Sequence, residues 1–477
     1  LRQEEVAPGP AMLAAVADGA AARFAFSPGI KVSRYGGKVL LWDPPTGSWC
    51  FLEEDRLPLV EGLKDLCDSG RQDLLPAGSE AVLEELFASG LVSRDGRYAW
   101  SPDLFAHHRN PVNTLILKVV GSCNLGCGYC YDYNQARFPK LMTLAAARQA
   151  IDGVWARSGP LLNVLFHGGE PMQAKALIFA LVPEIHARAA AEGKDVIFSI
   201  QTNGTLLDEE WCELFQRYRF SVGVSLDGDE SVNDRFRTTH SGRGTYEKIV
   251  GLLKRYDLLG EIGVLTTVTR HNVDRLVEIA LHFQALGVEL WDTSVFQSAG
   301  RGEGREDLFA PPTDRLVRAY LDLLAAIEDG RFTTLAVDCI LSYVRNVLSY
   351  RRGNMCLRSA CGAGSDLVSI SVDGAIEACD CIVNPDLRLG QLADGGSIAR
   401  ALDSPVAEAI RARHVDRLRP CAECDWRIVC GGSCLAKAGR LDAVDETECV
   451  LSLNLFPAIL GSLSRSDRLI EYAGRFA

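Results

Sequence analysis

Apolar and polar residues alternate along the middle of the chain in a pattern that switches repeatedly between strand and helix. Six short runs, rich in β-branched and apolar residues, predict strands at 114–120, 163–166, 196–201, 221–226, 262–268 and 289–295. Helical periodicity fills the gaps between these runs. Six repeats of strand and helix predict an α/β fold, in which a parallel sheet curves into a partial, TIM-like (β/α)6 barrel with helices outside. Active residues of such barrels gather where the strands end.

The N-terminal part of the chain follows a different pattern. Short strands are predicted over 30–33, 38–42 and 48–52, with a turn that begins at Asp43 and includes Pro44, Pro45 and Gly47. Helical periodicity follows over 57–66 and 82–87, and a short wing is predicted over 91–100. Three strands followed by helices predict a small winged-helix-like domain. A generic winged-helix module and a peptide-recognition domain both fit this pattern.

These patterns divide the chain into four predicted parts. They are the N-terminal domain at 1–105, the barrel at 106–310, a helical bridge at 311–350 and a cysteine-rich domain at 351–477, which ends in a helix from 451 onward. A chain of 477 residues is long enough for several domains, each with its own core.

Composition narrows the class of protein. The hydrophobic content of 47% is ordinary for a globular protein, and the net charge of −12 argues against nucleic acid as the main partner. No run of about 18 uninterrupted apolar residues predicts a membrane span, and the start LRQEEVAPGP does not look like a secretion signal. We therefore expect a cytoplasmic protein whose clustered cysteines bind metal and form no disulfides.

The first cysteine cluster is the motif CNLGCGYC, which contains Cys123, Cys127 and Cys130. A four-iron, four-sulfur cube takes four thiolates, so three of them leave one iron open to an outside molecule. A structural zinc site is the alternative, although zinc usually takes four ligands from paired knuckles.

Polar motifs follow three of the predicted strands. His167, Gly168, Gly169, Glu170 and Pro171 form HGGEP after the second strand, where two glycines allow a close backbone approach and a carboxylate can bind an ammonium group. The third and fourth strands end in QTNG, with Thr202 and Asn203, and in SLDG, with Ser225 and Asp227; Arg237 follows in NDRFR. Ordinary strand-end turns are the alternative for any one of these motifs.

The second cysteine cluster lies in the last third of the chain. Cys361 is followed by Gly374 and Cys379, and Cys421, Cys424, Cys430 and Cys434 are spaced CxxCxxxxxCxxxC before Cys449. A zinc ribbon is the alternative to iron-sulfur ligation here. Cys356 lies just upstream, and Cys381 lies in EACDC close enough to Cys379 to compete as a ligand.

Together these motifs resemble the radical S-adenosylmethionine (SAM) enzymes that carry a SPASM extension and mature ribosomally made peptides (RiPPs), over nearly the whole chain. The resemblance implies that Cys123, Cys127 and Cys130 hold a SAM-binding [4Fe-4S] cluster, and that reductive cleavage of SAM gives a 5′-deoxyadenosyl radical. It also implies two auxiliary [4Fe-4S] clusters. One would use Cys361, Cys379, Cys434 and either Cys356 or Cys381, and the other Cys421, Cys424, Cys430 and Cys449.

The same resemblance assigns expected roles to other residues. Tyr129 is the aromatic residue before the third cysteine, and Glu170 in the HGGEP segment meets the SAM amino group. Thr202, Asn203, Ser225 and Asp227 match the family's ribose and methionine contacts, and Arg237 is a candidate for the SAM carboxylate. Asp380 lies where sulfatase-maturing relatives place a general base, although a solvated turn aspartate is the alternative.

The implied function is a peptide maturase. It would abstract hydrogen from a precursor peptide and form a carbon-carbon or thioether crosslink, with electrons from a donor such as flavodoxin or ferredoxin. The N-terminal part resembles PqqD-like recognition domains, which implies that a leader peptide adds a strand to an exposed sheet edge. One alternative is a sulfatase-maturing enzyme that oxidises cysteine or serine to formylglycine. Another is a non-catalytic metal-cluster protein that binds peptides.

Overall fold

The main body of the computed structural model is one ten-stranded sheet, and residues 22–99, 111–349, 352–392 and 397–476 are described. Its strand order is β12-β11-β10-β9-β8-β7-β6-β13-β14-β15. Six neighbouring strands run parallel: β6 (Val112–Lys118), β7 (Ser158–His167), β8 (Asp195–Thr202), β9 (Ser221–Ser225), β10 (Ile262–Val268) and β11 (Leu290–Val295). The predicted α/β fold with a central parallel sheet is confirmed.

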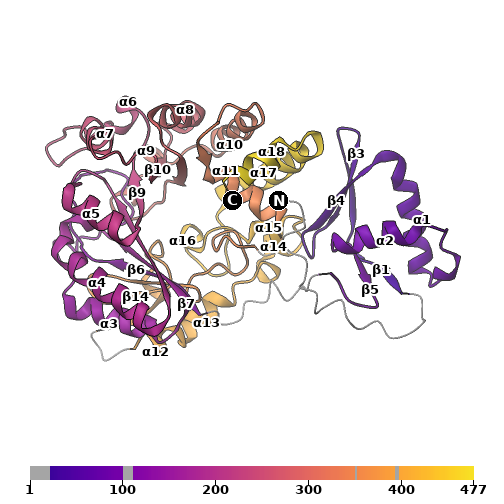
Figure 1. Ribbon diagram of the computed structural model, residues 1–477, viewed down its shortest axis with the longest axis horizontal. Coiled ribbons are helices and arrows are strands. Elements are labelled where there is room, and N and C mark those ends of the chain that lie inside the picture. Colours follow the sequence, from indigo (N-terminus) through magenta and orange to yellow (C-terminus); the bar gives the residue numbers. More distant parts are fainter. Residues whose placement is uncertain (1–21, 100–110, 350–351, 393–396, 477) are drawn as a thin grey trace.

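Helices alternate with these strands along the chain and lie along the outside of the sheet (Figure 1). They are α3 (Leu144–Trp155), α4 (Lys175–Glu192), α5 (Glu209–Tyr218), α6 (Glu230–Asn233), α7 (Tyr246–Arg255) and α8 (Leu276–Leu286). Local sequence sets their ends. The Asp208 carboxylate accepts a hydrogen bond from the backbone N–H of Trp211 and caps α5, and Gly193 ends α4 at a φ of +66°. The strand-helix repeat therefore leaves the carboxyl ends of β6–β11 together at one edge.

The cysteine-rich region continues the same sheet, which the sequence patterns do not predict. Strand β13 (Leu367–Ile370) pairs in parallel with β6, and β14 (Ala375–Glu377) and β15 (Arg388–Gln391) follow antiparallel. On the other side, the two-residue strand β12 (Ala336–Val337) pairs with β11. Strands of two to four residues carry too few positions for alternation to show.

The N-terminal part has the predicted order of strands and helices. Strands β2 (Lys31–Tyr35), β3 (Lys38–Asp43) and β4 (Ser48–Glu53) form an antiparallel sheet, and β1 (Phe24–Phe26) pairs antiparallel with β5 (Val92–Arg94). The helices are α1 (Leu57–Asp68) and α2 (Ser79–Ala88). Val39, Leu41, Leu63 and Leu83 belong to a core separate from that of the barrel. This part of the chain therefore has its own hydrophobic core, as a small domain needs in order to fold.

Strand β3 is buried on both faces, so the N-terminal domain is docked against the rest of the chain. Val39 and Leu41 face the domain's own core, whereas Leu40 and Trp42 belong to the large core shared with the barrel and the cysteine-rich region. The Trp42 indole N–H donates to the carbonyl of Asp425 at 3.1 Å, and its ring lies 4.9 Å from that of Trp426. The domain thus contacts the chain around Cys424.

Short helices surround the second cysteine cluster, and longer ones connect it to the barrel. They are α9 (Glu306–Phe309), α10 (Thr313–Glu328), α11 (Asp338–Leu348), α12 (Ile398–Leu402), α13 (Pro405–Arg411), α14 (Arg419–Ala422), α15 (Arg427–Cys430), α16 (Leu435–Ala438), α17 (Glu446–Arg465) and α18 (Arg468–Arg475). The predicted domain limits at 105/106 and 350/351 lie outside the described residues.

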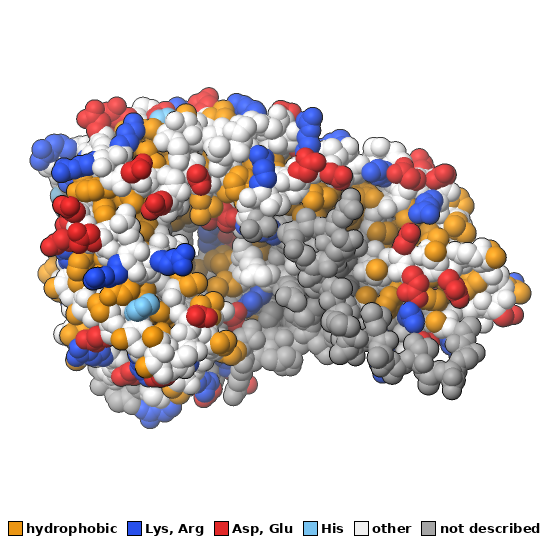
Figure 2. Space-filling model, viewed as in Figure 1, with side chains coloured by type: hydrophobic (Ala, Val, Ile, Leu, Met, Phe, Trp, Pro, Cys, Tyr) orange, Lys and Arg blue, Asp and Glu red, His pale blue; other side chains and the backbone are white. Residues whose placement is uncertain are grey.

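Helix α17 alone, among the described helices, has the length and apolar composition of a membrane span, but 56% of that stretch is buried in the fold. A helix that is buried in a protein core can have the same length and apolar composition. On the face shown in Figure 2, acidic and basic side chains are interspersed and do not gather into one basic patch.

Candidate active site

The predicted site motifs meet at one edge of the sheet. The cysteine loop follows β6, HGGEP follows β7, QTNG follows β8 and SLDG follows β9. Because neighbouring parallel strands end at the same edge, these four segments lie side by side. The structure thus brings together the residues that the sequence predicts for SAM binding.

The three thiols of the first motif lie in a largely apolar setting. Cys127 is buried in a cluster with Leu125 and Tyr129, against which Cys123 and Cys130 pack. Burial raises the pKa of the Cys123 thiol to about 12 and that of Cys130 to about 11. Burial therefore favours neutral thiols, and a bound metal cation would reverse this preference.

Backbone and amide donors point to one of these sulfurs. The backbone N–H of Leu125 lies 3.4 Å from the Cys123 sulfur, and the side-chain amide of Asn203 lies 3.7 Å from it. Asn203 also donates to the side chain of Asn124 at 2.9 Å. Three thiols on one loop, with donors to sulfur, fit an iron-sulfur cluster with three protein ligands.

The HGGEP segment packs directly against the cysteine loop. A Cβ on Gly169 would lie 2.0 Å from the carbonyl oxygen of Ser122, and this glycine has a φ of +51°. Glu170 follows, and its backbone N–H donates to the same carbonyl at 2.9 Å. Only glycine therefore fits this close approach.

Glu170 is a buried acceptor. Its carboxylate accepts hydrogen bonds from the backbone N–H groups of Met172 and Asn203 and from the Thr202 hydroxyl, at 2.7 to 3.0 Å. Burial raises the pKa of Glu170 despite these donors. Glu170 thus ties HGGEP to QTNG, and its contact with a SAM ammonium group stays a prediction. Pro171 is buried at the start of the short helix that follows.

Asp227 and Arg237 pair with each other. The Arg237 guanidinium donates to Asp227 at 3.0 Å, and the Tyr129 hydroxyl donates to the other Asp227 oxygen. The Arg237 guanidinium also lies 5.6 Å from the centre of the Tyr129 ring. This buried group links SLDG to the cysteine loop. At the end of β9, Ser225 accepts a hydrogen bond from Gln201 on the neighbouring strand β8.

Asp380 is buried beside the carboxyl ends of β6 and β7. Its carboxylate accepts a hydrogen bond from the Tyr131 hydroxyl at 2.8 Å, and the thiols of Cys379 and Cys381 lie 3.4 and 3.6 Å from it. Burial acts to raise the pKa of Asp380, but the nearby His167 and Lys118 outweigh it, and the pKa is lowered. The alternative of a solvated turn aspartate is therefore not what the structure shows.

Two further residues belong to this network, and the motif analysis missed both. Lys118 is the last residue of β6 and donates to Asp132 at 2.5 Å and to the backbone carbonyl of Asp380 at 2.7 Å. Asp132 also accepts a hydrogen bond from the backbone N–H of Gly169. The signal in the sequence was a lysine within the apolar run TLILKVV, since a lysine inside a buried strand needs a partner.

Five cysteines gather near Asp380, of which four can bind one cube. Burial and the thiols of Cys361 and Cys381 raise the pKa of Cys356 to about 12, and Cys381 also acts on Cys434. The sulfurs of Cys379 and Cys381 lie within 4.8 Å of each other. Thiolates on two irons of a cube are roughly 6 Å apart, whereas two on one metal ion are roughly 4 Å apart. This spacing favours Cys356 over Cys381 as the partner of Cys379 in a cube.

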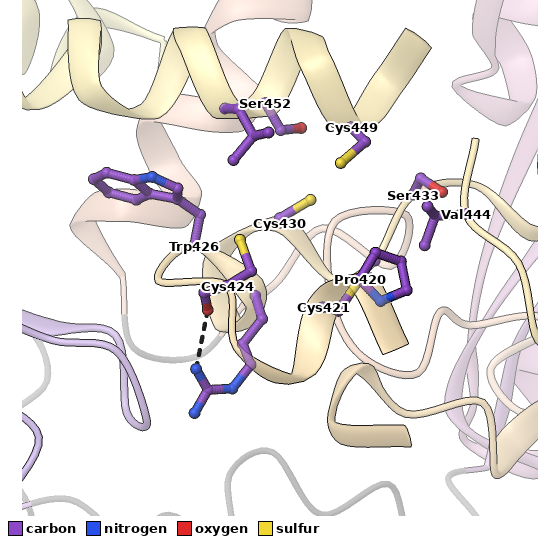
Figure 3. Close-up of a pocket in the computed structure, with 12 residues that line it drawn as sticks. Pro420, Cys421, Cys424, Trp426, Cys430, Ser433, Val444, Cys449 and Ser452 are labelled. Carbon is purple, nitrogen blue, oxygen red and sulfur yellow. Dashed lines mark hydrogen bonds between the residues drawn. The ribbon is translucent and has the colours of Figure 1, made fainter. Parts of the chain in front are cut away.

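The other four cysteines line one pocket. Cys421, Cys424, Cys430 and Cys449 line this pocket together with Trp426 and Ser452. Figure 3 shows the sulfurs of Cys424, Cys430 and Cys449 pointing into this space, the last from helix α17. Four thiols from three segments around one cavity fit a fully ligated cluster.

Comparisons with known proteins agree with this geometry. A family model described as the Radical SAM superfamily matches residues 117–283. The serine-type anaerobic sulfatase-maturating enzyme of Klebsiella aerogenes is 30% identical over 357 residues, which cover 70% of this chain and 82% of that protein. The cysteine-type enzyme of Clostridium novyi is 23% identical over 339 residues, 68% and 87% of the two chains.

Solved structures show the same fold. Native anSMEcpe with bound AdoMet has a TM-score of 0.64 at 19% identity and covers 77% of this chain and 100% of its own; the same protein is also solved with a Cp18Cys peptide. Streptococcus suis SuiB bound to the precursor peptide SuiA has a TM-score of 0.54 at 14% identity, covering 89% and 99%. The chain therefore belongs to the radical SAM superfamily, and within it to the family that includes the anaerobic sulfatase-maturating enzymes.

Proposed function

We propose that this radical SAM enzyme oxidises a serine or cysteine side chain of a peptide or protein substrate, with Asp380 as the general base. The observation that carries this proposal is the buried carboxylate of Asp380, which is hydrogen-bonded to Tyr131 and adjoins the cluster cysteine Cys379. The relationship to the serine-type anaerobic sulfatase-maturating enzymes of Klebsiella aerogenes and Klebsiella pneumoniae supports this proposal. This reverses the emphasis of the sequence prediction, which placed crosslinking first.

The proposed reaction is a two-electron oxidation. When bound at the three-cysteine loop, SAM and its cluster would supply a carbon radical that removes one hydrogen atom from the substrate carbon and becomes 5′-deoxyadenosine. Asp380 would take the proton of the substrate hydroxyl or thiol, and an auxiliary cluster would accept the remaining electron. A serine would thereby lose two hydrogen atoms and become an aldehyde, that is, formylglycine.

The proposed cofactors are SAM and three [4Fe-4S] clusters. The SAM-binding cluster would use Cys123, Cys127 and Cys130. The two auxiliary clusters would use these residues: Cys356, Cys361, Cys379 and Cys434 for one, and Cys421, Cys424, Cys430 and Cys449 for the other. A flavodoxin or ferredoxin would supply the electron that cleaves SAM. About twelve irons per chain after anaerobic reconstitution would support this assignment, and bound zinc would contradict it.

A crosslinking peptide maturase is the second candidate, and the N-terminal domain favours it. The SuiB structures cover 89% of this chain, whereas the anSMEcpe structure covers 77%. Strand β2 pairs only with β3 among the described residues, and Val32 on it is 47% exposed. A leader peptide could add a strand at this edge. Closing a carbon-carbon or thioether bond also removes two hydrogen atoms, so the same residues would serve either reaction.

The test is a reaction with serine- and cysteine-containing peptides, SAM and a strong reductant under anaerobic conditions. Formation of 5′-deoxyadenosine separates an enzyme from a non-catalytic cluster protein. A modified peptide that reacts with a hydrazide carries an aldehyde, whereas one that has lost two hydrogens and does not react is crosslinked. Intact SAM with fully loaded clusters would refute both candidates.

Variants test the role of Asp380 within this reaction. Asp380→Asn should still form 5′-deoxyadenosine but should lose product by a factor of about 10² to 10⁴, the usual contribution of a general base. Asp373→Asn is the matched control, because Asp373 belongs to the same region and pairs with Arg137 without contacting Asp380. Equal product yield from Asp380→Asn and the wild type would refute the assignment.

A further inference from the structure

One buried ammonium group lies where three loops of the candidate active site meet. Lys118 is 4% exposed, and its Nζ donates to the Asp132 carboxylate at 2.5 Å and to the backbone carbonyl of Asp380 at 2.7 Å. The second oxygen of Asp132 accepts the backbone N–H of Gly169 at 3.0 Å. Asp132 follows Cys130 by two residues. Lys118 therefore ties the cysteine loop and the loop of Asp380 directly to the end of β6, and it ties the HGGEP loop through Asp132.

Charge explains why the ammonium group remains there. Burial acts to lower the pKa of Lys118, but Asp132, Asp380 and Glu377 outweigh it and raise the pKa. A buried cation with a close carboxylate and a carbonyl acceptor has little freedom to move, because each alternative position would leave a charge unpaired. Lys118 thus acts as a rigid connection.

Close packing of the backbone also holds the HGGEP loop against Lys118. A Cβ on Gly168 would lie 2.7 Å from the Cβ of Lys118 and 2.9 Å from its Cα, so the HGGEP loop rests on β6 at this residue. The contact with Asp380 is made to its carbonyl oxygen, and the Tyr131 hydroxyl binds its carboxylate. Lys118 therefore holds the backbone of the Asp380 loop, whereas Tyr131 orients the Asp380 carboxylate.

We propose that Lys118 is a positioning residue that fixes the loop of Asp380, which comes from the cysteine-rich region, over the carboxyl end of the barrel. This inference rests on the proposed role of Asp380 as the base. Lys118 touches neither substrate nor cofactor in this proposal. Its removal should let the Asp380 loop move away from the barrel while SAM cleavage continues, so that radicals form but fewer of them lead to product.

The test compares Lys118→Met, Lys118→Arg and Lys118→Gln as reconstituted holoenzymes with the wild type. In Lys118→Met, the product formed per 5′-deoxyadenosine should fall at least about tenfold in enzyme that keeps its iron. Because Lys118 also pairs with Asp132 on the cysteine loop, the readout is this ratio and not the amount of 5′-deoxyadenosine. The loss should appear in kcat, with KM for the peptide unchanged. Lys118→Arg keeps the cation and should restore most of the coupling, and Lys118→Gln should lie between.

Lys194→Met is the matched control. Lys194 is a half-buried lysine that donates to the carbonyls of Trp155 and Ser158, next to the start of β8 and so at the opposite edge of the sheet. The holoenzyme of this variant should keep normal coupling. If Lys118→Met does not fold, the comparison of Lys118→Arg with Lys118→Gln decides, because only the former keeps the charge.

Hydrogen exchange gives a readout that needs no substrate. In the Lys118→Met holoenzyme, amides of residues 378–383 should exchange faster than in the wild type, and the amides of the N-terminal domain should not change. If exchange is faster in Lys118→Met but the wild type forms no product, the proposed function is refuted and the role of Lys118 in holding the loop is kept. Unchanged exchange and coupling would overturn the inference, as would equal losses of 5′-deoxyadenosine and product.

Discussion

The buried carboxyl group of Asp292 should make the stability of the protein depend on pH. Asp292 lies on β11, accepts a hydrogen bond from the backbone N–H of Thr293 at 2.7 Å, and is close to Asp338 at the start of α11. Burial, with the charge of Asp338, raises the pKa of Asp292 from 3.8 to about 6. Asp338 has its own partner, Arg345, at 2.7 Å. Asp292→Asn removes the buried acid and keeps its shape.

The sign of the pH dependence follows from the direction of the shift. Because the folded pKa lies above the ordinary value, the Asp292 carboxyl favours the folded state while it is protonated. This contribution is lost as the pH rises from about 4 to about 6, and the cost is constant above that. The cost of Asp292 relative to a neutral side chain is about 1 to 2 kcal/mol at pH 5 and about 3 kcal/mol at pH 8. Asp292→Asn should therefore be more stable than the wild type, by an amount that grows up to a pH slightly above 6 and is then constant to pH 8.

The assay is the thermal unfolding of both holoenzymes between pH 5 and pH 8 under anaerobic conditions. A difference of 1 kcal/mol moves Tm by about 2–4 °C in a domain of about 200 residues. The advantage of Asp292→Asn should therefore grow by several degrees between these two pH values. Asp322→Asn, exposed on α10, is the control for an aspartate-to-asparagine change. An advantage that stays constant with pH, or a loss of stability at pH 8, would refute the reasoning.

Three further predictions concern the SAM loop, the auxiliary ligands and the domain contact. Gly169→Ala should weaken SAM binding at least about tenfold in equilibrium titrations, because its Cβ has no space, whereas Gly193→Ala, also at a positive φ but with open space around it, should cost only about 1 kcal/mol of stability and leave SAM binding unchanged. Cys356→Ser should lose about four irons per chain and Cys381→Ser none, as counted by iron analysis; the reverse would show that Cys381 is the ligand. Trp42→Ala should cost about 3–5 kcal/mol of docking free energy and give the N-terminal domain a separate, earlier unfolding transition; a single unchanged transition would contradict it.

Much of the barrel could be predicted because its strands alternate over enough residues to be seen. Strand β10 has the predicted limits, and its side chains alternate between buried and partly exposed positions along its whole length. The first strand was predicted at 114–120 but runs over Val112–Lys118. Beyond it, Val119 bonds to His167 and Val120 pairs with Leu141, so apolar character continues past the end of the ladder.

Contacts between distant segments could not be predicted in this way. The pairing of β13 with β6 joins residues about 250 positions apart, and no local pattern records it. The same holds for Lys118 and Asp380, which come from the barrel and the cysteine-rich region. Motif spacing predicts which cysteines act as ligands, since their order along the chain carries that information. The choice between Cys356 and Cys381 depends on a distance, which only the fold provides.

The docking of the N-terminal domain determines how the two candidate functions can be separated. Trp42 on β3 contacts Trp426, which lines the four-cysteine pocket, and Lys31 on β2 forms an ion pair with Asp425. Deleting the domain would therefore expose that pocket, and activity would fall even if no leader peptide binds. A change confined to the free edge, such as Val32→Asp, leaves the β3 contacts in place. If it weakens the use of a full precursor peptide and not of a short one, leader recognition at β2 is supported; equal effects on both would favour an enzyme that selects its substrate in the barrel alone.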